Sequence, residues 1–299
     1  MNINFIKYRK FYFIFSGILI LAAISSLMIF GLKPGIDFTG GSILELEFKT
    51  ERPNTFQIQE KLAELNLGEF YLQPTGQKGL ILRMGDITQE SHQKILEKLG
   101  NLQELNELRF ESIGPIIGKE LKEKTKIVII LSLLAILLYI AFSFRKIQRP
   151  ISSWQYGLAS LLVLFHDILI PLGIFSILGK FSGVQITIPV ITALLTVVGY
   201  AINNVVVVYD RIRENILKFG KLDFAQIVNQ SINQTLTRQI NTSLTTLFPL
   251  FFIFFFGGET LKYFALTLIL GILAGTYSSI FLAGPILVSW PRPFLKWRK

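Results

Sequence analysis

Six long apolar segments constrain the fold of this chain more than any other feature of its sequence. A helix of roughly 20 apolar residues crosses about 30 Å of hydrocarbon, and 51% of the residues are hydrophobic, an unusually high share for a soluble protein. We therefore predict an α-helical membrane protein with six transmembrane helices. They lie at about residues 12–31, 127–144, 156–178, 186–208, 242–257 and 261–289.

Basic residues indicate the orientation of the spans, because short loops rich in Lys and Arg stay on the cytoplasmic side. Such clusters precede the first span and follow the second, fourth and sixth spans: Lys7, Arg9 and Lys10; Arg145, Lys146 and Arg149; Arg211, Arg213, Lys218 and Lys221; Arg292, Lys296, Arg298 and Lys299. We expect both termini to be cytoplasmic and the loop 32–124 to lie outside. The net charge of +10 then reflects topology, and no nucleic-acid partner is expected.

The long loop alternates strand-like and helix-like patterns. Strand-like runs at Ser42–Phe48, Phe70–Leu72, Leu80–Met84 and Leu108–Ile113 are interrupted by two helical patterns, one around Ile58 and Leu62 and one around Ile95 and Leu99. The order βαββαβ predicts a small α+β ferredoxin-like domain with two helices on one face of a four-stranded sheet. The predicted organisation is thus 1–31 (N-terminus and first helix), 32–124 (extracytoplasmic domain) and 125–299 (helices two to six and C-terminus).

A glycine-rich motif, GIDFTGG, follows the first span at residues 35–41. Gly35, Gly40 and Gly41 allow a sharp chain reversal, and Asp37 can bond neighbouring amides in the turn. Glycine-rich loops also bind phosphate, but this motif lacks the GKS or GKT ending of such loops. We therefore interpret it as a structural turn.

The fourth span carries polar residues at helical spacing. Thr196, Tyr200 and Asn203 or Asn204 recur three or four residues apart and form a polar stripe within the hydrocarbon. The stripe is compatible with hydrogen bonds that hold helices together. It is equally compatible with a transport pathway.

Three further spans carry unusual residues. His166 and Asp167 interrupt the third span, and an ionisable residue at that depth is a functional candidate by default. Arg238 precedes the fifth span and shares a helix face with Thr242 and Thr245, where it can also serve as an interfacial anchor. In the last span the small residues Gly271, Gly275, Ser279 and Ala283 recur every four positions, a pattern typical of close helix packing.

Catalytic signatures are missing from the sequence. It contains no Walker loop, HExxH or GxSxG motif and no cysteine, and its two histidines are far apart in the predicted topology. We expect neither enzymatic activity nor a cofactor nor a metal.

Four motifs together resemble the SecD/SecF family of protein-export subunits, within the resistance-nodulation-division superfamily. They are GIDFTGG, the HD pair, the segment that ends in DRIREN (Asp210, Arg211, Arg213 and Glu214 among its residues) and the stretch 238–246. The resemblance covers nearly the whole chain. It implies one half of a resistance-nodulation-division bundle that works with SecD beside the SecYEG translocon, with YajC as a further candidate partner.

The resemblance also implies a function and a set of site residues. Members use a proton or sodium gradient to promote translocation of unfolded polypeptides across the bacterial plasma (inner) membrane, so this chain is expected to be an accessory subunit embedded in membrane lipid. Conserved family motifs correspond to Gly35, Asp37, Phe38, Thr39, Gly40, Gly41, Asp210, Arg211, Arg213 and Glu214. The ion-route candidates are Asn203, Asn204, Arg238, Thr242, Asp167 and Tyr200.

One departure from the family pattern concerns Asn204. The family usually has Asp at this position, near the arginine that aligns with Arg238, whereas an amide does not titrate. Either SecD supplies the carboxylate, or Asp167 substitutes for it, or the chain is a non-coupling scaffold for SecD and the translocon. A small-molecule exporter of the same superfamily is a further alternative, although such exporters usually have two fused halves and two large outer domains.

Overall fold

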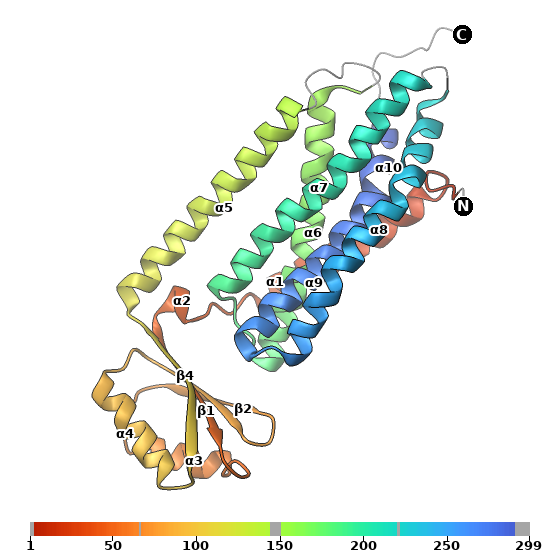
Figure 1. The fold of residues 1–299 in the computed structure, drawn as a ribbon. Coiled ribbons are helices and arrows are strands. Elements are labelled where there is room, and N and C mark those ends of the chain that lie inside the picture. The colour runs from red at the N-terminus through yellow and green to blue at the C-terminus, as the bar shows by residue number, and fades with distance from the viewer. Residues whose placement is uncertain (1–2, 66, 144–150, 220–221, 291–299) are drawn as a thin grey trace. The chain divides into compact units, whose positions relative to one another are not determined.

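The computed structural model describes residues 3–65, 67–143, 151–219 and 222–290, and this part of the chain divides into two compact units (Figure 1). The helical unit contains residues up to Leu32, Ile129–Val184 and the chain from Ile188 onward. The sheet unit contains Lys33–Val128 and the short segment Gln185–Thr187. An α-helical bundle with a small α+β unit between its first two long helices is the fold class that the sequence predicts.

The helical unit consists of long helices and one π-helical turn. They are α1 (Arg9–Phe30), α5 (Pro115–Ser143, which begins in the sheet unit), α6 (Ser153–Ser182), α7 (Ile188–Lys218), α8 (Phe224–Phe256), α9 (Glu259–Ser278), the π-helical turn Ser279–Ala283 and α10 (Gly284–Ser289). Within the described residues, five segments are long and apolar enough to cross a membrane: Arg9–Phe30, Ser153–Ser182, Ile188–Lys218, Phe224–Phe256 and Leu261–Ser289. The sixth predicted span, 127–144, corresponds to the apolar end of α5, and its last residue lies outside the described chain.

Helix α9 lies at the centre of the helical unit, where it packs against α6, α7 and α8 (Figure 1). Helix α1 packs against α6 through very small residues, because a Cβ atom on Gly173 would lie only 2.6 Å from the Cα of Ala23. Two hydrogen bonds cross this contact. The Ser26 hydroxyl donates to the Gly173 carbonyl at 2.7 Å, and the Ser176 hydroxyl donates to the Ser26 carbonyl at 2.8 Å.

The sheet unit has the predicted βαββαβ order. Its elements are β1 (Gly41–Phe48), α3 (Thr55–Ala63), β2 (Phe70–Thr75), β3 (Gly79–Met84), α4 (Gln89–Gly100) and β4 (Leu105–Ile113), and the sheet order β2-β3-β1-β4 is antiparallel throughout. Helices α3 and α4 cover one face of the sheet (Figure 1). Alternate residues of β1 and β3 meet Ile58, Leu62, Ile95 and Leu99 of these helices in a fully buried core. This arrangement confirms the predicted ferredoxin-like fold.

The GIDFTGG motif forms a single helical turn, α2 (Ile36–Thr39), that leads into β1. Ile36 packs on the sheet beside Ile43 and Ile81, and the backbone then reverses at Gly40, with φ 75° and ψ 165°. Only glycine adopts this conformation readily. A Cβ atom on Gly40 would also lie 2.7 Å from the Cα of Pro115, so both backbone conformation and space require glycine here.

The segment Gln185–Thr187 joins the sheet unit by backbone hydrogen bonds. Ile186 pairs with Pro34 in a parallel bridge: its amide donates to the Lys33 carbonyl, and its carbonyl accepts from the Gly35 amide, both at 2.7 Å. The Arg83 guanidinium donates to the Gln185 side chain. The predicted fourth span begins at about residue 186, whereas α7 begins at Ile188, because the backbone of Ile186 takes part in this pairing.

Several basic residues used for the orientation argument lie outside the described chain: Arg145, Lys146, Arg149, Lys221, Arg292, Lys296, Arg298 and Lys299.

The geometry at Gly40 yields a first prediction. Gly40→Ala should destabilise the sheet unit by about 1–3 kcal/mol from backbone strain alone, with the contact to Pro115 adding to this cost. Gly85→Ala is the matched control, because a Cβ atom there meets nothing within 4 Å. Protease resistance of the sheet unit in the purified full chain, measured against temperature, should fall for Gly40→Ala only. Equal resistance of the two variants would show that position 40 tolerates a side chain.

Candidate functional site

A buried carboxylate lies in the middle of α6. Asp167 is 0% exposed and His166 is 1% exposed. The Asp167 Oδ1 atom lies 2.9 Å from His166 Nδ1, and Asp167 Oδ2 accepts a hydrogen bond from the Ser278 hydroxyl of α9 at 2.8 Å. The other ring nitrogen of His166, Nε2, is buried without a hydrogen-bond partner among the described residues.

Two glycines bring α9 close to α7 beside this carboxylate. A Cβ atom on Gly271 would lie 2.2 Å from a methyl of Val197, and one on Gly275 would lie 3.1 Å from the Cβ of Ala201 and 3.5 Å from Asp167 Oδ2. Both helices advance four residues between these contacts, so they run parallel there. At this level the backbone of Gly275 lies between Ala201 of α7 and the carboxylate of Asp167.

A second polar network joins α7, α8 and α9. The Tyr200 hydroxyl donates to the Ser243 hydroxyl at 3.2 Å, and Ser243 lies 2.6 Å from the Thr276 hydroxyl. One turn further along, the Ser279 hydroxyl donates to Gln239 Oε1 at 2.6 Å. Each of these hydroxyl and amide groups obtains a partner inside a helix bundle that offers little water.

The ion-route candidates on α7 point in different directions. Asn203 is exposed, Tyr200 is half-buried and Asn204 is 3% exposed, because successive helical residues are about 100° apart. The amide nitrogen of Asn204 is buried without a hydrogen-bond partner among the described residues. The predicted polar stripe is thus split between the interior of the unit and its surface.

The candidates on α8 lie on the outer face of that helix. Arg238 is exposed, and its side chain forms no ion pair or hydrogen bond with another described residue, while the Thr242 hydroxyl donates to the Arg238 carbonyl at 2.7 Å. Asn204 therefore does not contact Arg238 through a hydrogen bond in this chain. The structure brings Asp167 and Tyr200 into polar networks, leaves Asn203 and Arg238 on the surface, and leaves Thr242 half-buried beside Arg238.

The charged residues at the end of α7 pair along the helix surface. Arg213 bonds Asp210 at 2.7 Å, and Arg211 and Lys218 bond Glu214 at 2.8 and 2.7 Å. The neighbouring Asn215, by contrast, is 1% exposed and donates to Ser231 at 2.8 Å and to Gln234 at 2.9 Å on α8. The buried amide thus fixes the α7–α8 contact, whereas the charges remain solvated.

The buried stripe of α8, formed by Thr235, Gln239 and Ser243, is not among the residues predicted from the sequence. The spacing of four residues is the signal that could have indicated a buried stripe. The adjacent residues Arg238, Thr242 and Thr245, however, have a similar spacing on a neighbouring face of the same helix. Ser278 was also missed, and Ser279 was interpreted only as a small packing residue. The π-helical turn that begins at Ser279 adds one residue to the helical repeat, so the residues there lie on a different face of the helix from the one that a spacing of four predicts.

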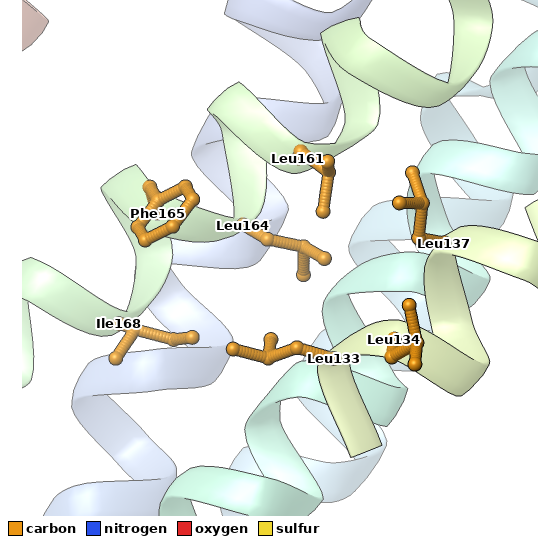
Figure 2. Close-up of a pocket in the computed structure, with 7 residues that line it drawn as sticks. All are labelled: Leu133, Leu134, Leu137, Leu161, Leu164, Phe165 and Ile168. Carbon is orange, nitrogen blue, oxygen red and sulfur yellow. The ribbon is translucent and has the colours of Figure 1, made fainter. Parts of the chain in front are cut away.

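A cleft of about 260 Å³ opens between α5 and α6 (Figure 2). Figure 2 shows that only apolar side chains line it: Leu133, Leu134, Leu137, Leu161, Leu164, Phe165 and Ile168. It offers no group that could bind an ion. The described residues also contain no cluster of three or more potential metal ligands.

Comparison with known proteins gives the same family over most of the chain. Residues 92–292 match the family model of the C-terminal part of the protein export membrane proteins SecD and SecF, and residues 25–51 match the SecD/SecF GG motif. The chain belongs to the SecD/SecF family. The resemblance expected from the four sequence motifs is confirmed, and with its long apolar helices the chain is a multi-pass membrane protein.

Similar relatives bear the name protein translocase subunit SecF. The chain is 40% identical to SecF of Thermobaculum terrenum, over 96% of this chain and 94% of the relative, and 34% identical to SecF of Synechocystis, over 100% and 96%. A crystal structure of SecDF, a translocon-associated membrane protein from Thermus thermophilus, is 34% identical, with a TM-score of 0.84 over 97% of this chain. This SecF-like chain spans 39% of that SecDF chain.

The contact at Gly271 yields a second prediction. Gly271→Ala should destabilise the helical unit by about 1–3 kcal/mol, because the added methyl overpacks against Val197. Gly199→Ala is the control. It meets nothing within 4 Å and should stabilise α7 by up to about 1 kcal/mol. Thermal unfolding can be followed by the fluorescence of Trp154 and Trp290, whose rings lie 5.6 Å apart.

The double variant Gly271→Ala with Val197→Ala tests the mechanism of that loss. Removing the Val197 methyl groups makes room for the new Cβ atom, so part of the lost stability should return. A double variant no more stable than Gly271→Ala would contradict close packing at this position.

Proposed function

We propose that this chain is the SecF-type accessory subunit of Sec protein export and acts with a SecD-type partner at the translocon. The proposal rests chiefly on the 40% identity to a SecF relative over almost the full length of both chains. The role is non-enzymatic. The subunit promotes translocation of unfolded polypeptide across the bacterial plasma membrane, with SecYEG and YajC as candidate neighbours.

The exposed polar face of α7 and α8 supports a partner within the membrane. Thr196 and Asn203 of α7 and Arg238, Asn241 and Thr245 of α8 are all exposed in the single chain. In hydrocarbon such groups face other helices or a water-filled cavity, because lipid cannot hydrogen-bond them. We propose that the helices of SecD complete this face. Our chain spans 39% of the SecDF neighbour, so the rest of that neighbour is long enough to contain a second set of helices of this kind.

The orientation belongs to the same proposal. The basic clusters favour cytoplasmic termini, and with that orientation the sheet unit, inserted in the sequence between α1 and the apolar part of α5, lies outside. There it can meet an emerging polypeptide and the outer domain of SecD.

An ion gradient is the proposed energy source. One elementary charge crossing the membrane is worth about 2.3 kcal/mol per 100 mV, which is enough to shift a two-state equilibrium appreciably. Arg238 is the charge on the exposed polar face of this chain, and we propose that it pairs with a carboxylate of SecD. Asn204 cannot provide this carboxylate, because its amide does not titrate.

Asn204 also favours a second candidate function. A SecF-type chain that binds no coupling ion could serve SecD and the translocon as a scaffold. The exposed polar face would then only hold the two halves together, and variants that preserve assembly would preserve export.

Export measurements distinguish the two functions and give a third prediction. In vesicles that lack native SecF, Arg238→Ala should lower gradient-dependent completion of export by about tenfold or more, because a hydrogen bond to a charged group contributes about 1.5–3 kcal/mol. Arg238→Lys should recover part of the activity, and Thr237→Ala, on the adjacent exposed position, should resemble the wild type. Asn204→Ala should have a milder effect than Arg238→Ala, and Asn204→Asp should change export only modestly.

The amount of SecD that co-purifies with each variant separates coupling from assembly. Normal export by Arg238→Ala in a normally assembled complex would exclude an ion route through this face and favour the scaffold. A large gain in gradient-dependent export from Asn204→Asp would show instead that the natural chain couples export to the gradient poorly because it lacks this carboxylate.

A further inference from the structure

We propose that the buried cluster of His166, Asp167 and Ser278 is a proton-binding site of this chain, which takes up and releases one proton as a unit. The inference deepens the proposed function, because it assigns a titrating group to the subunit itself. It rests on the geometry of the cluster and on two buried polar atoms that have no hydrogen-bond partner among the described residues.

The hydrogen bonds of the cluster define where the proton binds. Nδ1 of His166 faces the carboxylate, so the neutral ring carries its hydrogen on Nδ1 and keeps a lone pair on Nε2. In this form the pair has one net negative charge. A proton from the aqueous phase forms a new N–H bond at Nε2, or, with transfer of the Nδ1 hydrogen, yields a carboxylic acid beside a neutral ring. In the second case the Nδ1–H bond breaks as the O–H bond of Asp167 forms, and in both cases the pair that has taken up the proton is neutral.

Burial makes this uptake favourable. His166, Asp167 and Ser278 are at most 1% exposed, and an uncompensated charge is poorly tolerated in such surroundings. The neutral, proton-loaded pair is therefore the stable resting form. Releasing the proton requires donors that stabilise the carboxylate in its place.

Two hydrogen-bond donors lie at about the same depth in the helix bundle as the Asp167 carboxylate. Ser278 already donates to Asp167 Oδ2. The contacts Val197 with Gly271 and Ala201 with Gly275 set a register between α7 and α9, and the next step of three places Asn204 beside Ser278. The amide nitrogen of Asn204 is buried without an acceptor among the described residues, so it is the available second donor.

Among the described residues, the elements packed around the pair bring an ionisable tyrosine to it. Tyr277 of α9 stacks on His166 with ring centroids 5.8 Å apart, and its hydroxyl lies 3.1 Å from the Ser16 hydroxyl of α1. From α7, Ala201 and Asn204 face the site, and neither of them ionises. The proton is therefore assigned to the histidine and the carboxylate together, and their titration is a property of the pair.

The chain suits a direct test because it has only two histidines. The full chain, labelled with ¹⁵N-histidine and reconstituted in lipid vesicles, shows two rings by nuclear magnetic resonance, and a His166→Gln sample identifies which signals belong to His166. Infrared spectra of the same samples report the carboxyl group of Asp167 by difference from Asp167→Asn. We expect His166 and Asp167 to change together at one pH midpoint.

Two variants should shift the midpoint in opposite directions, and a third serves as the control. Asp167→Asn removes the negative neighbour of the ring and should reduce the proton affinity of His166 by about tenfold or more. Ser278→Ala removes a donor to the carboxylate and should move the midpoint to higher pH. Thr267→Val should leave the midpoint unchanged, because buried Thr267 on α9 hydrogen-bonds only within its own helix.

Constant His166 signals across the accessible pH range, or an unchanged midpoint in Asp167→Asn, would overturn the proposal. Signals that respond to Na⁺ in place of choline at fixed pH would also overturn it, in favour of a cation site. The measurement requires no export, so the proton site and the export role can fail independently.

Discussion

The structure depends on the lack of water inside a helix bundle, because a polar group left there without a hydrogen bond is costly. The Asp167 carboxylate contacts its neighbour His166 and the Ser278 hydroxyl, and Gln239 on α8 accepts from Ser279. These contacts are directional, so they fix the rotation of α6, α8 and α9 about their own axes. The same constraint underlies the proposal that SecD covers the polar groups left on the surface of α7 and α8.

Close packing of the helices brings these polar groups within hydrogen-bonding distance of one another. Gly271 lets α9 approach α7 more closely than a methyl group would allow without movement of Val197, and Gly275 makes a similarly tight contact with Ala201 that places the backbone of α9 beside the carboxylate. Immediately afterwards α9 changes to a π-helical turn at Ser279–Ala283, and such turns are frequent at functional sites. The Tyr209 hydroxyl donates to the Ala283 carbonyl at 3.3 Å, so α7 supports α9 on both sides of the turn.

Much of the fold is predictable from local pattern, but the rotation of the helices is not. The apolar segments and the βαββαβ order follow from hydropathy and periodicity, and the reversal at GIDFTGG follows from the freedom of glycine. On α8 the conspicuous residue Arg238 is exposed and Thr242 is half-buried, while the buried stripe lies one position further along, at Gln239 and Ser243. Two polar faces of similar spacing give no local signal that distinguishes them. Only packing against α9 decides between them.

The central claim is that this chain is half of a membrane bundle whose polar face on α7 and α8 is completed by SecD. Because the chain contains no cysteine, single cysteines give an unambiguous test. Asn203→Cys and Asn241→Cys should form cross-links to cysteines in the SecD helices, whereas Leu21→Cys on the exposed apolar surface of α1 should react with a lipid-soluble probe. If Asn203→Cys and Asn241→Cys instead reacted with the lipid-soluble probe and formed no cross-link to SecD, the account would be contradicted.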